Sequence, residues 1–257
     1  MTLTHGLLRM LAAYSEGCRL AVEFGSHSGV VFEYTCENRP QGTGVVGRWI
    51  DRRFLELWGS RRLRLRLEEK KRLLAAMIED RRAAERPVTV LDVASGTGRA
   101  LRELCADYEA AALTVVCHDR DPRKVMQGRE LVAQEKLANV TFAVGDATDA
   151  ASYLILNEPD IVLATGLFPL LQRDDALRTV IRLAFEHLRE GGYFVCTATR
   201  HRDPASSRWD GPLAPPIVDR PVEAVAGWLR ASGFAATRVE RLSAGEPLVI
   251  GVKGAEV

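Results

Sequence analysis

The chain lacks long hydrophobic runs and paired cysteines. No stretch of its 257 residues approaches the roughly 18 consecutive apolar residues that span a bilayer. The N-terminal segment MTLTHGLLRMLAAY has no basic region and no convincing secretory cleavage site. Five cysteines occur, an odd number without any C-x-x-C pair, which argues against a disulfide framework. We therefore expect a protein of the reducing cytoplasm that is not exported.

The chain also lacks an excess of charge of either sign. Its formal net charge is +1, so the composition carries no signature of a polyanionic partner. Basic residues are nevertheless crowded between residues 48 and 72. Two interpretations of this segment stay open: a solvated helical face, or a patch for an anionic substrate or a membrane surface. A hydrophobic content of 47 % and a charged content of 27 % are typical of a globular protein with a substantial core.

From residue 88 onward, apolar β-branched runs alternate with helical patterns. This alternation predicts an α/β fold with a mostly parallel sheet covered on both faces. Only SAGEP separates the last two strands, which should therefore pair antiparallel as a hairpin. The expected strands lie near 88–93, 113–118, 140–144, 160–164, 192–198, 235–242 and 247–252, and the expected helices near 98–107, 122–135, 174–188 and 221–232.

Residues 1–86 do not follow the alternating pattern, so we expect an N-terminal extension ahead of a domain over 87–257. Leucines at helical spacing predict an amphipathic first helix. Two short alternating runs in RLAVEFGSHSGVVFEYT, residues 19–35, predict a β-hairpin. The stretch NRPQGTGVVG, residues 38–47, predicts a flexible, lid-like loop, and the sequence after it predicts helices up to residue 86.

The sequence PVTVLDVASGTGRAL, residues 87–101, predicts a strand, a small-residue turn and a helix start. Ligands of open α/β sheets bind at such strand ends. A dinucleotide-binding turn would need three glycines at positions that here hold Ala94, Gly96 and Arg99, so only one fits. Asp92 would also repel a pyrophosphate at the helix N-terminus. The turn therefore favours a ligand with a positive charge.

Asp92-Val93-Ala94-Ser95-Gly96-Thr97-Gly98 resembles the first motif of the class I S-adenosylmethionine (SAM) dependent methyltransferases, D-x-G-x-G-x-G, with alanine in place of the first glycine. The resemblance implies a Rossmann-like, seven-stranded sheet that ends in an antiparallel pair, and SAM as the cofactor. Another Rossmann-like binder or a purely structural turn would be the alternative for this motif alone.

Acidic residues at three strand ends match the demands of SAM. Asp92 can accept from the ligand ammonium, and Asp119 from both ribose hydroxyls. Asp121 is the weaker candidate, since it precedes Pro122 at an expected helix start and fits a helix cap. Asp146 can accept from the adenine amino group, or alternatively cap a helix. The expected cofactor residues are Asp92, Ala94, Ser95, Gly96, Gly98, Asp119, Arg120, Asp146, Ala147, Thr165 and Gly166.

The sequence indicates less about the molecule that accepts the methyl group than about the cofactor. After the fourth strand, Thr165-Gly166-Leu167-Phe168 does not resemble the N/D-P-P-Y/F/W motif of nucleobase and amide methyltransferases, so no nucleic acid is expected as substrate. Asp174 and Asp175 are adjacent, but their place at a helix start fits capping better than a metal, and we predict no metal.

The N-terminal string from Asn38 to Leu74, together with VLDVASGTGR, TGLFPL and REGGYFVCT, resembles a bacterial methyltransferase family related by name to phospholipid methylation. The positions that carry this N-terminal resemblance are Asn38, Arg39, Pro40, Gly42, Gly47, Arg48, Ile50 and Asp51.

Four residues are candidates for a general base in methyl transfer: His118, His201, Tyr34 and Asp51. Alternatively, His118 is a wall residue of the adenosine pocket and His201 an exposed loop residue. Aromatic residues such as Phe168 are more often core than substrate contacts. The candidate substrate-binding residues are Arg39, Arg48, Leu167 and Phe168.

The predicted function is SAM-dependent methylation of a small molecule at an amine, a hydroxyl or a lipid head group. Two alternatives stay open. The first is another displacement on SAM, either cyclisation with release of methylthioadenosine or aminocarboxypropyl transfer. The second is a non-catalytic SAM-binding module. The 48–72 segment could contact a membrane peripherally, and a homodimer is compatible with the sequence.

Overall fold

The computed structural model describes residues 3–24, 29–199, 218–243 and 247–254. These residues form two compact units, each described by itself below. Unit 1 consists mainly of residues up to Glu68, and unit 2 holds most of the residues from Glu69 onward. The division falls inside a long helix rather than at the expected boundary at residue 86. The reason is that the second half of this helix belongs to the core of unit 2.

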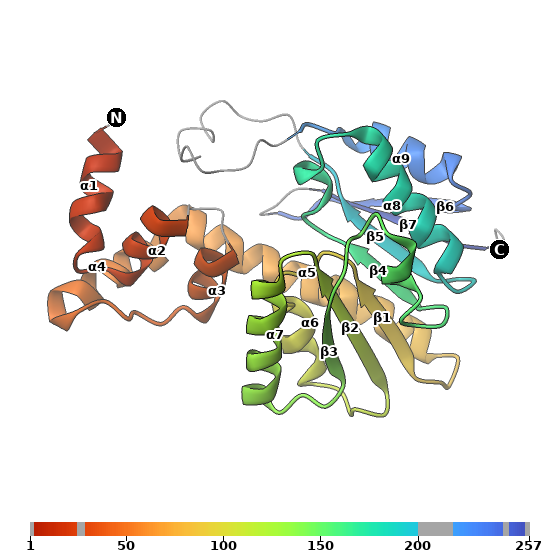
Figure 1. Cartoon of the computed structure of the whole chain (residues 1–257), viewed down its shortest axis with the longest axis horizontal. Helices are drawn as coiled ribbons and strands as arrows, with labels where there is room; N and C mark the ends of the chain where they lie inside the picture. The colour runs from red at the N-terminus through yellow and green to blue at the C-terminus, as the bar shows by residue number, and fades with distance from the viewer. Residues whose placement is uncertain (1–2, 25–28, 200–217, 244–246, 255–257) are drawn as a thin grey trace. The chain divides into compact units, whose positions relative to one another are not determined.

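Helices make up the described part of unit 1 (Figure 1). The elements are α1 (Leu3–Ala12), α2 (Glu16–Phe24), α3 (Gly29–Glu37), α4 (Gly44–Glu56) and α5 (Trp58–Arg82), whose first part lies in this unit. The β-hairpin expected over residues 19–35 is wrong: α2 and α3 occupy this stretch, and residues 25–28 lie outside the described residues. Leu20, Val31 and Tyr34 pack with Leu55 in one small core, and helices bring their side chains to the same side.

The expected loop over residues 38–47 is only partly correct, because α4 begins at Gly44. Gly42 and Gly47 allow backbone segments to pack closely against each other. A Cβ at Gly47 would lie 2.2 Å from the Tyr14 carbonyl oxygen, and one at Gly42 would lie 2.3 Å from the Gly47 oxygen. Only glycine allows the backbone to approach this closely. The glycines of this segment therefore fix the start of α4 against the end of α1.

Unit 2 contains a seven-stranded sheet of order β3-β2-β1-β4-β5-β7-β6 (Figure 1). Strands β1 to β5 pair in parallel, while β7 pairs antiparallel with both β5 and β6. The strands are β1 (Val88–Asp92), β2 (Leu113–Asp119), β3 (Val140–Val144), β4 (Ile161–Ala164), β5 (Tyr193–Thr197), β6 (Ala236–Glu240) and β7 (Leu248–Val252). The helices are α6 (Arg99–Cys105), α7 (Pro122–Glu135), η1 (Ala150–Tyr153), η2 (Phe168–Leu170), α8 (Asp174–His187) and α9 (Val222–Ala231).

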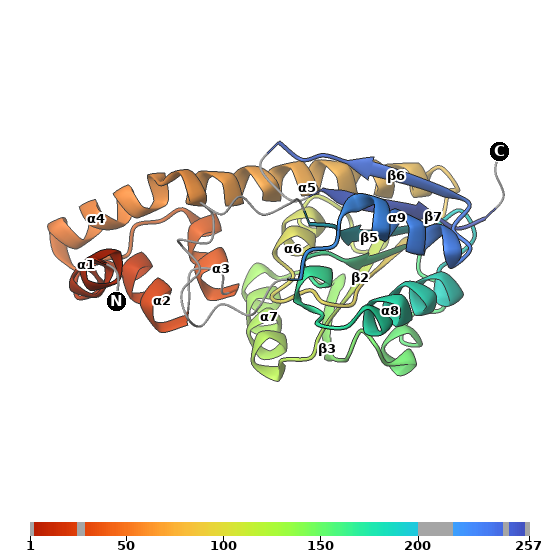
Figure 2. The same cartoon turned by 90° about the horizontal axis from the view of Figure 1, so that it is seen from above.

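Both faces of the sheet are buried, as the continuous apolar strands predict. Leu74, Met77 and Ile78 of α5 pack on one face with residues of α6 and α7. Residues of α8 and α9 cover the other face, and Figure 2 shows α8 and the second half of α5 on opposite sides of the sheet. The predicted strands and helices from residue 88 onward are confirmed, including the antiparallel pair at the C-terminal end.

No helix within the described ranges is both long enough and apolar enough to cross a membrane.

Candidate functional site

The turn between β1 and α6 is held to the end of β2 by backbone hydrogen bonds. The Ser95 amide donates to the His118 carbonyl at 2.8 Å, and the Gly96 amide donates to the Asp119 carboxylate at 3.0 Å. Because β1 and β2 are parallel neighbours, their carboxyl ends meet at the same edge of the sheet. The turn and the Asp119 carboxylate are therefore bonded to each other at this edge of the sheet.

Gly96 and Gly98 both have left-handed backbone conformations, with φ of 60° and 67°. A Cβ at Gly98 would lie 2.7 Å from Phe142 Cζ and 3.0 Å from Cys117 Sγ, so Gly98 faces the core. A Cβ at Gly96 would meet nothing within 4 Å. Gly96 thus borders open space at the strand ends, where a ligand can approach the backbone.

Asp119 ends β2 with a nearly buried side chain. Besides the Gly96 amide, its carboxylate accepts from the Asp121 amide at 2.9 Å, and Lys124 Nζ lies 3.6 Å away. A carboxylate has about four acceptor positions, so these contacts leave capacity for further donors. Asp121 is the N-cap of α7, and its side chain accepts from the Arg123 amide at 3.0 Å. The prediction that Asp121 caps this helix is confirmed.

Asp92 ends β1 and is almost fully buried. Burial raises the pKa of its carboxyl to about 6, whereas the Lys70 ammonium and the Ala94 amide, which donates at 3.2 Å, act in the opposite direction. Asp92 is therefore a carboxyl group whose charge is only partly compensated by its surroundings.

Lys70 is a site residue that the sequence reasoning missed. Its Nζ atom donates to Thr165 Oγ1 at 2.5 Å, at the end of β4. In the sequence it stands three residues after Leu67 and four before Leu74, both of which are buried. A lysine at this spacing lies on the buried face of the helix, and that signal could have separated it from the other basic residues of the segment.

Asp146 follows β3 and is exposed. Its carboxylate accepts from the Thr148 amide at 2.8 Å and from Thr148 Oγ1 at 2.7 Å, and these bonds lower the pKa of the carboxyl. The alternative that Asp146 caps a helix is wrong, because Asp149 is the N-cap of η1. Ala147 is buried, and its carbonyl accepts from the Tyr153 hydroxyl at 2.9 Å. The loop after β3 is thus fixed while the Asp146 side chain stays exposed.

The segment after β4 contains residues of different exposure. Thr165 and Leu167 are half-buried and Gly166 is exposed, with its amide donating to Thr197 Oγ1 at 2.8 Å. Phe168 is fully buried and packs against Phe194. Its burial favours the alternative that Phe168 is a core residue, and its contact with substrate stays a prediction. Arg120, after β2, is exposed.

The histidine candidates do not gain support as bases. His118 is 3 % exposed, burial lowers its pKa, and neither ring nitrogen has a hydrogen-bond partner. A Cβ at Gly145 would lie 2.7 Å from His118 Nδ1, so the ring lies directly under the loop that follows β3. His118 is therefore a buried imidazole with a lowered pKa rather than a base open to a substrate. His201 lies outside the described residues.

Tyr34 and Asp51, expected as catalytic residues, are buried inside unit 1. The Asp51 carboxylate is fully buried and accepts from Ser15 Oγ at 2.5 Å, Tyr34 Oη at 2.5 Å, the Gly17 amide at 3.0 Å and the Gln41 amide at 2.9 Å. Burial, followed by the bond to Asp51, raises the pKa of Tyr34. This network gives both residues a role in holding α2, α3 and α4 together, and their catalytic role stays a prediction.

Other basic residues of unit 1 differ in their environment. Arg39, Arg48 and Arg52 are exposed. Arg64 donates to the carbonyls of Thr35 at 3.2 Å and Leu55 at 2.9 Å, and so serves the packing of its own unit. The basic residues of this segment therefore lie in more than one environment.

The adjacent carboxylates at the start of α8 do not cap it. The N-cap residue is Arg173, Asp174 accepts from Arg220 Nε at 3.0 Å, and Asp175 pairs with Arg173. Throughout the part of the chain that the structure describes, no cluster of three or more histidine, cysteine or acidic residues could hold a metal ion.

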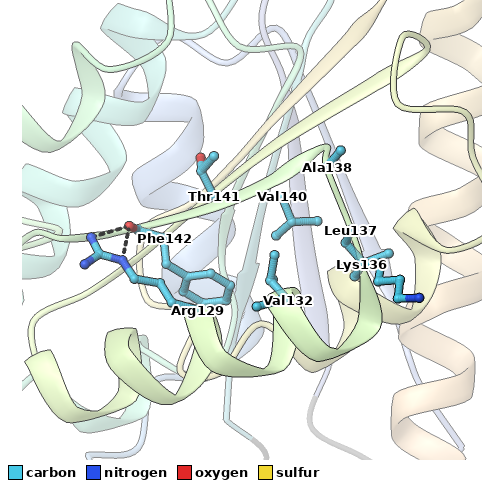
Figure 3. Close-up of a pocket in the computed structure, with 9 residues that line it drawn as sticks. Arg129, Val132, Lys136, Leu137, Ala138, Val140, Thr141 and Phe142 are labelled. Atoms are coloured by element: carbon cyan, nitrogen blue, oxygen red, sulfur yellow. Dashed lines mark hydrogen bonds between the residues drawn. The ribbon is translucent and has the colours of Figure 1, made fainter.

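A hollow of about 470 Å³ lies between α7 and the edge strand β3 (Figure 3). It is lined mostly by apolar side chains, and the Arg129 guanidinium next to it donates to the Phe142 carbonyl at 2.7 and 3.0 Å. None of Asp92, Asp119 and Asp146 lines this hollow. It is therefore separate from the candidate site at the strand ends.

The same arrangement of elements occurs in solved methyltransferases. An O-methyltransferase family protein from Burkholderia thailandensis superposes with a TM-score of 0.55 at 18 % identity, covering 98 % of this chain and 82 % of the other. The SAM-dependent methyltransferase SibL superposes with a TM-score of 0.57 at 15 % identity, covering 97 % and 75 %. A protein described as a possible exported protein from Bordetella parapertussis gives a TM-score of 0.70 at 21 % identity, covering 98 % and 87 %. The fold is that of the Rossmann-like methyltransferases, as the resemblance in the sequence predicts.

Sequence comparison assigns the chain to one family within this class. Residues 1–204 match the model of a family described as "Putative methyltransferase", and the chain belongs to that family. The Escherichia coli (strain K12) protein YnbC, described as uncharacterized, is 27 % identical over 192 residues, which are 74 % of this chain and 33 % of YnbC. The chain thus spans about a third of the length of this curated relative. The link by name to phospholipids stays a prediction.

Proposed function

We propose that the protein transfers a methyl group from SAM to a small molecule, with SAM bound at the carboxyl ends of β1, β2 and β3. One observation carries the proposal. Of the three neighbouring strands, β1 ends at Asp92 and β2 at Asp119, while Asp146 follows the end of β3, and the turn at Gly96 is bonded directly to the Asp119 carboxylate. Each carboxylate matches one polar group of the ligand.

The chemistry of these residues fits SAM. Asp92 would accept from the ammonium group, Asp119 from the ribose hydroxyls, and Asp146 with the Ala147 amide would meet the adenine edge. The open space beside Gly96 leaves room for the ligand against the backbone of the turn. Three carboxylates near these strand ends also favour a ligand that carries the positive charge of a sulfonium.

Bound SAM supplies an electrophilic methyl group. The residues of the chain then act by holding the ligand and the acceptor in line and by excluding water. The burial of His118, which also lowers its pKa and so its basicity, argues against this residue as a proton acceptor from the substrate. Positioning, rather than general base catalysis by His118, is thus the expected source of rate enhancement.

The acceptor is proposed to be an amine, a hydroxyl compound or a lipid head group. Thr165-Gly166-Leu167 at the end of β4 offers a hydroxyl and backbone groups but no planar amide-binding motif, which disfavours nucleobases. The four buried thiols Cys18, Cys105, Cys117 and Cys196 fit a reducing compartment, so we place the reaction in the cytoplasm as part of the proposal.

Peripheral membrane contact is part of the same proposal. Val45, Val46 and Trp49 of α4 are 79 %, 64 % and 57 % exposed, and the exposed Arg48 and Arg52 stand among them. A helix face that mixes exposed apolar residues with arginines suits the surface of an anionic bilayer.

Product identity tests the proposal. The protein is incubated with SAM carrying a labelled methyl group, first alone and then with fractionated small-molecule extracts. Release of S-adenosylhomocysteine (SAH) together with a labelled product supports methyl transfer. Release of methylthioadenosine from SAM alone would favour cyclisation or aminocarboxypropyl transfer instead. Saturable SAM binding without turnover on any fraction would favour a binding module.

A further inference from the structure

The hollow between α7 and β3 lies at an outer edge of the sheet, because β3 stands at one end of the strand order. The Val115 amide donates to the Asn139 carbonyl at 2.8 Å. Farther along, the Gly145 amide donates to the Asp119 carbonyl at 3.2 Å. The odd-numbered residues of this segment therefore direct their backbone groups toward β2, and the even-numbered residues direct theirs away from the sheet. Such an outward row of backbone groups is a template for another strand.

Arg129 of α7 occupies the middle of this edge. Its Nε and Nη2 atoms donate to the outward-facing Phe142 carbonyl at 3.0 and 2.7 Å (Figure 3). A strand added at this edge would have to displace the guanidinium, so the hollow beside it suits a small molecule better than a peptide strand. A carbonyl accepts these bonds without neutralising the guanidinium, and Nη1 can donate to a further acceptor. Arg129 is thus a positioned cation at the border of the hollow.

The hollow is apolar between two basic residues. The apolar side chains that line it include those of Val132, Leu137 and Val140. Lys136 lies seven residues after Arg129, about 10 Å along the helix axis, so the two cations lie toward opposite ends of the hollow. Among the described residues that line it, none is acidic. Glu135, next to Lys136 in the chain, pairs with the buried Arg102. The volume of about 470 Å³ is within the range of small-molecule sites.

We propose that this hollow binds a medium-chain alkyl carboxylate, with the carboxylate on Arg129 and the chain along the apolar side chains toward Leu137. The basic border attracts an anion, and the apolar lining stabilises each methylene that it removes from water. A ligand with an ammonium in place of the carboxylate meets repulsion, and a carboxylate without a chain loses the apolar contacts. The inference goes beyond the proposed function, since Asp92, Asp119 and Asp146 do not line the hollow.

Three ligands separate the contributions of charge and chain. Decanoate, decylammonium and acetate are titrated calorimetrically into the full-length protein, with the two long-chain ligands below the concentrations at which they form micelles. We expect saturable binding of decanoate. Binding of the other two should be at least about tenfold weaker, because each lacks one of the two complementary features.

Two variants of α7 locate the site. Ala133 and Gln134 are both exposed, but of the two Ala133 lines the hollow and Gln134 does not. Ala133→Glu and Gln134→Glu therefore add the same charge to the same helix, inside and outside the hollow. Ala133→Glu should weaken decanoate binding at least about tenfold, by repulsion and by loss of space. Gln134→Glu, the matched control, should stay within about twofold of wild type. Urea unfolding midpoints check that both variants are folded.

Several results would overturn the inference. Wild-type protein that does not bind decanoate, or that binds decylammonium or acetate equally well, excludes the site without the need for any variant. Unchanged decanoate affinity in Ala133→Glu places the ligand elsewhere on the chain. Equal losses in Ala133→Glu and Gln134→Glu reduce the effect to the general charge of α7. Titration of SAH into the same proteins tests the proposed function separately, so the two failures are distinguishable.

Discussion

At the scale of single residues, Asp92 is buried, although its proposed contact with a ligand ammonium requires the charged carboxylate. Its carboxyl has an ordinary pKa of 3.8 and a value of about 6 in the folded chain, because burial disfavours the charged form more than Lys70 and the Ala94 amide favour it. Since the folded pKa is raised, the contribution of this carboxyl to stability is complete below about pH 4 and is lost as the pH rises through about 6. A ligand ammonium would supply a positive charge that stabilises the ionised Asp92 carboxylate.

This balance predicts a pH dependence of binding. Only the ionised carboxylate can pair with an ammonium, so SAH affinity should fall about tenfold between pH 7.5 and pH 5. Calorimetric titrations across this range measure it. Asp92→Asn should bind weakly with little change over the same range. An Asp92→Asn variant that keeps the wild-type pH profile would show that another group titrates.

The two glycines of the turn predict different effects on stability. Gly96→Ala adds only the strain of a left-handed backbone, about 1 kcal/mol, since its Cβ enters open space. Gly98→Ala adds a collision with Phe142 and Cys117, and we expect a loss of about 3 kcal/mol. Urea unfolding of both variants measures the difference. Gly96→Ala should also weaken SAH binding, and equal stability losses in the two variants would contradict this description of the turn.

At the scale of elements, the helices of unit 1 depend on one buried carboxylate. Asp51 accepts from a residue before α2, the backbone of α2, a side chain of α3 and the loop before α4. A buried carboxylate that receives several hydrogen bonds ties these elements together, and losing one donor leaves part of its charge uncompensated.

Tyr34→Phe tests this structural role. The variant removes one hydrogen bond to Asp51 and should lower the free energy of unfolding by about 1–2 kcal/mol. Turnover of the folded variant should stay within about twofold of wild type, a change too small for the loss of a general base. Tyr14→Phe, at an exposed tyrosine of the same unit, is the control. A large loss of turnover at unchanged stability would restore the catalytic interpretation of Tyr34.

The sequence predicts unit 2 better than unit 1 for physical reasons. The strands of unit 2 are continuous apolar runs, and their helices have clear starts such as Asp121 before Pro122. In unit 1, α2 and α3 have only nine residues each, and Leu20, Val31 and Tyr34 have neighbours that also fit a two-residue alternation. Tertiary packing of these residues with Leu55 stabilises the helical conformation over the extended one.

The candidate site, too, could be predicted only in part from the sequence. Strand-end carboxylates could be located from the sequence, because parallel strands bring their ends together. The partnership of Lys70 with Thr165 joins residues 95 positions apart, and only the packing of α5 on the sheet creates it. Likewise, the sequence places Phe168 after one strand and His118 near the end of another. Their burial, however, depends on side chains from elsewhere in the chain.

At the scale of the whole molecule, the family match over residues 1–204 includes Met1–Glu68, the main part of unit 1, so this segment belongs to the family's common architecture. Its proposed contact with membranes can be tested separately from catalysis. We expect the full chain to sediment with vesicles of phosphatidylcholine and phosphatidylserine more than with phosphatidylcholine alone, and less at high salt.

The double variant Trp49→Ala and Arg52→Ala should lose most of this binding, because it removes an exposed aromatic and a cation from the same face of α4. Arg182→Ala, at an exposed arginine of α8, serves as the control. Sedimentation that is independent of phosphatidylserine and unaffected by the double variant would exclude this surface as a membrane contact.

The central claim is that SAM binds at the carboxyl ends of β1 to β3, with Asp119 at its centre. Calorimetric titration of SAH into wild type, Asp119→Ala and Asp121→Ala tests it most directly. Asp119→Ala should weaken binding by about 1.5–3 kcal/mol, roughly 10- to 150-fold, because it removes a charge-assisted acceptor. Asp121→Ala, which loses only the cap of α7, should bind as wild type does. Wild-type protein that does not bind SAH, or an Asp119→Ala variant with unchanged affinity, would contradict the claim.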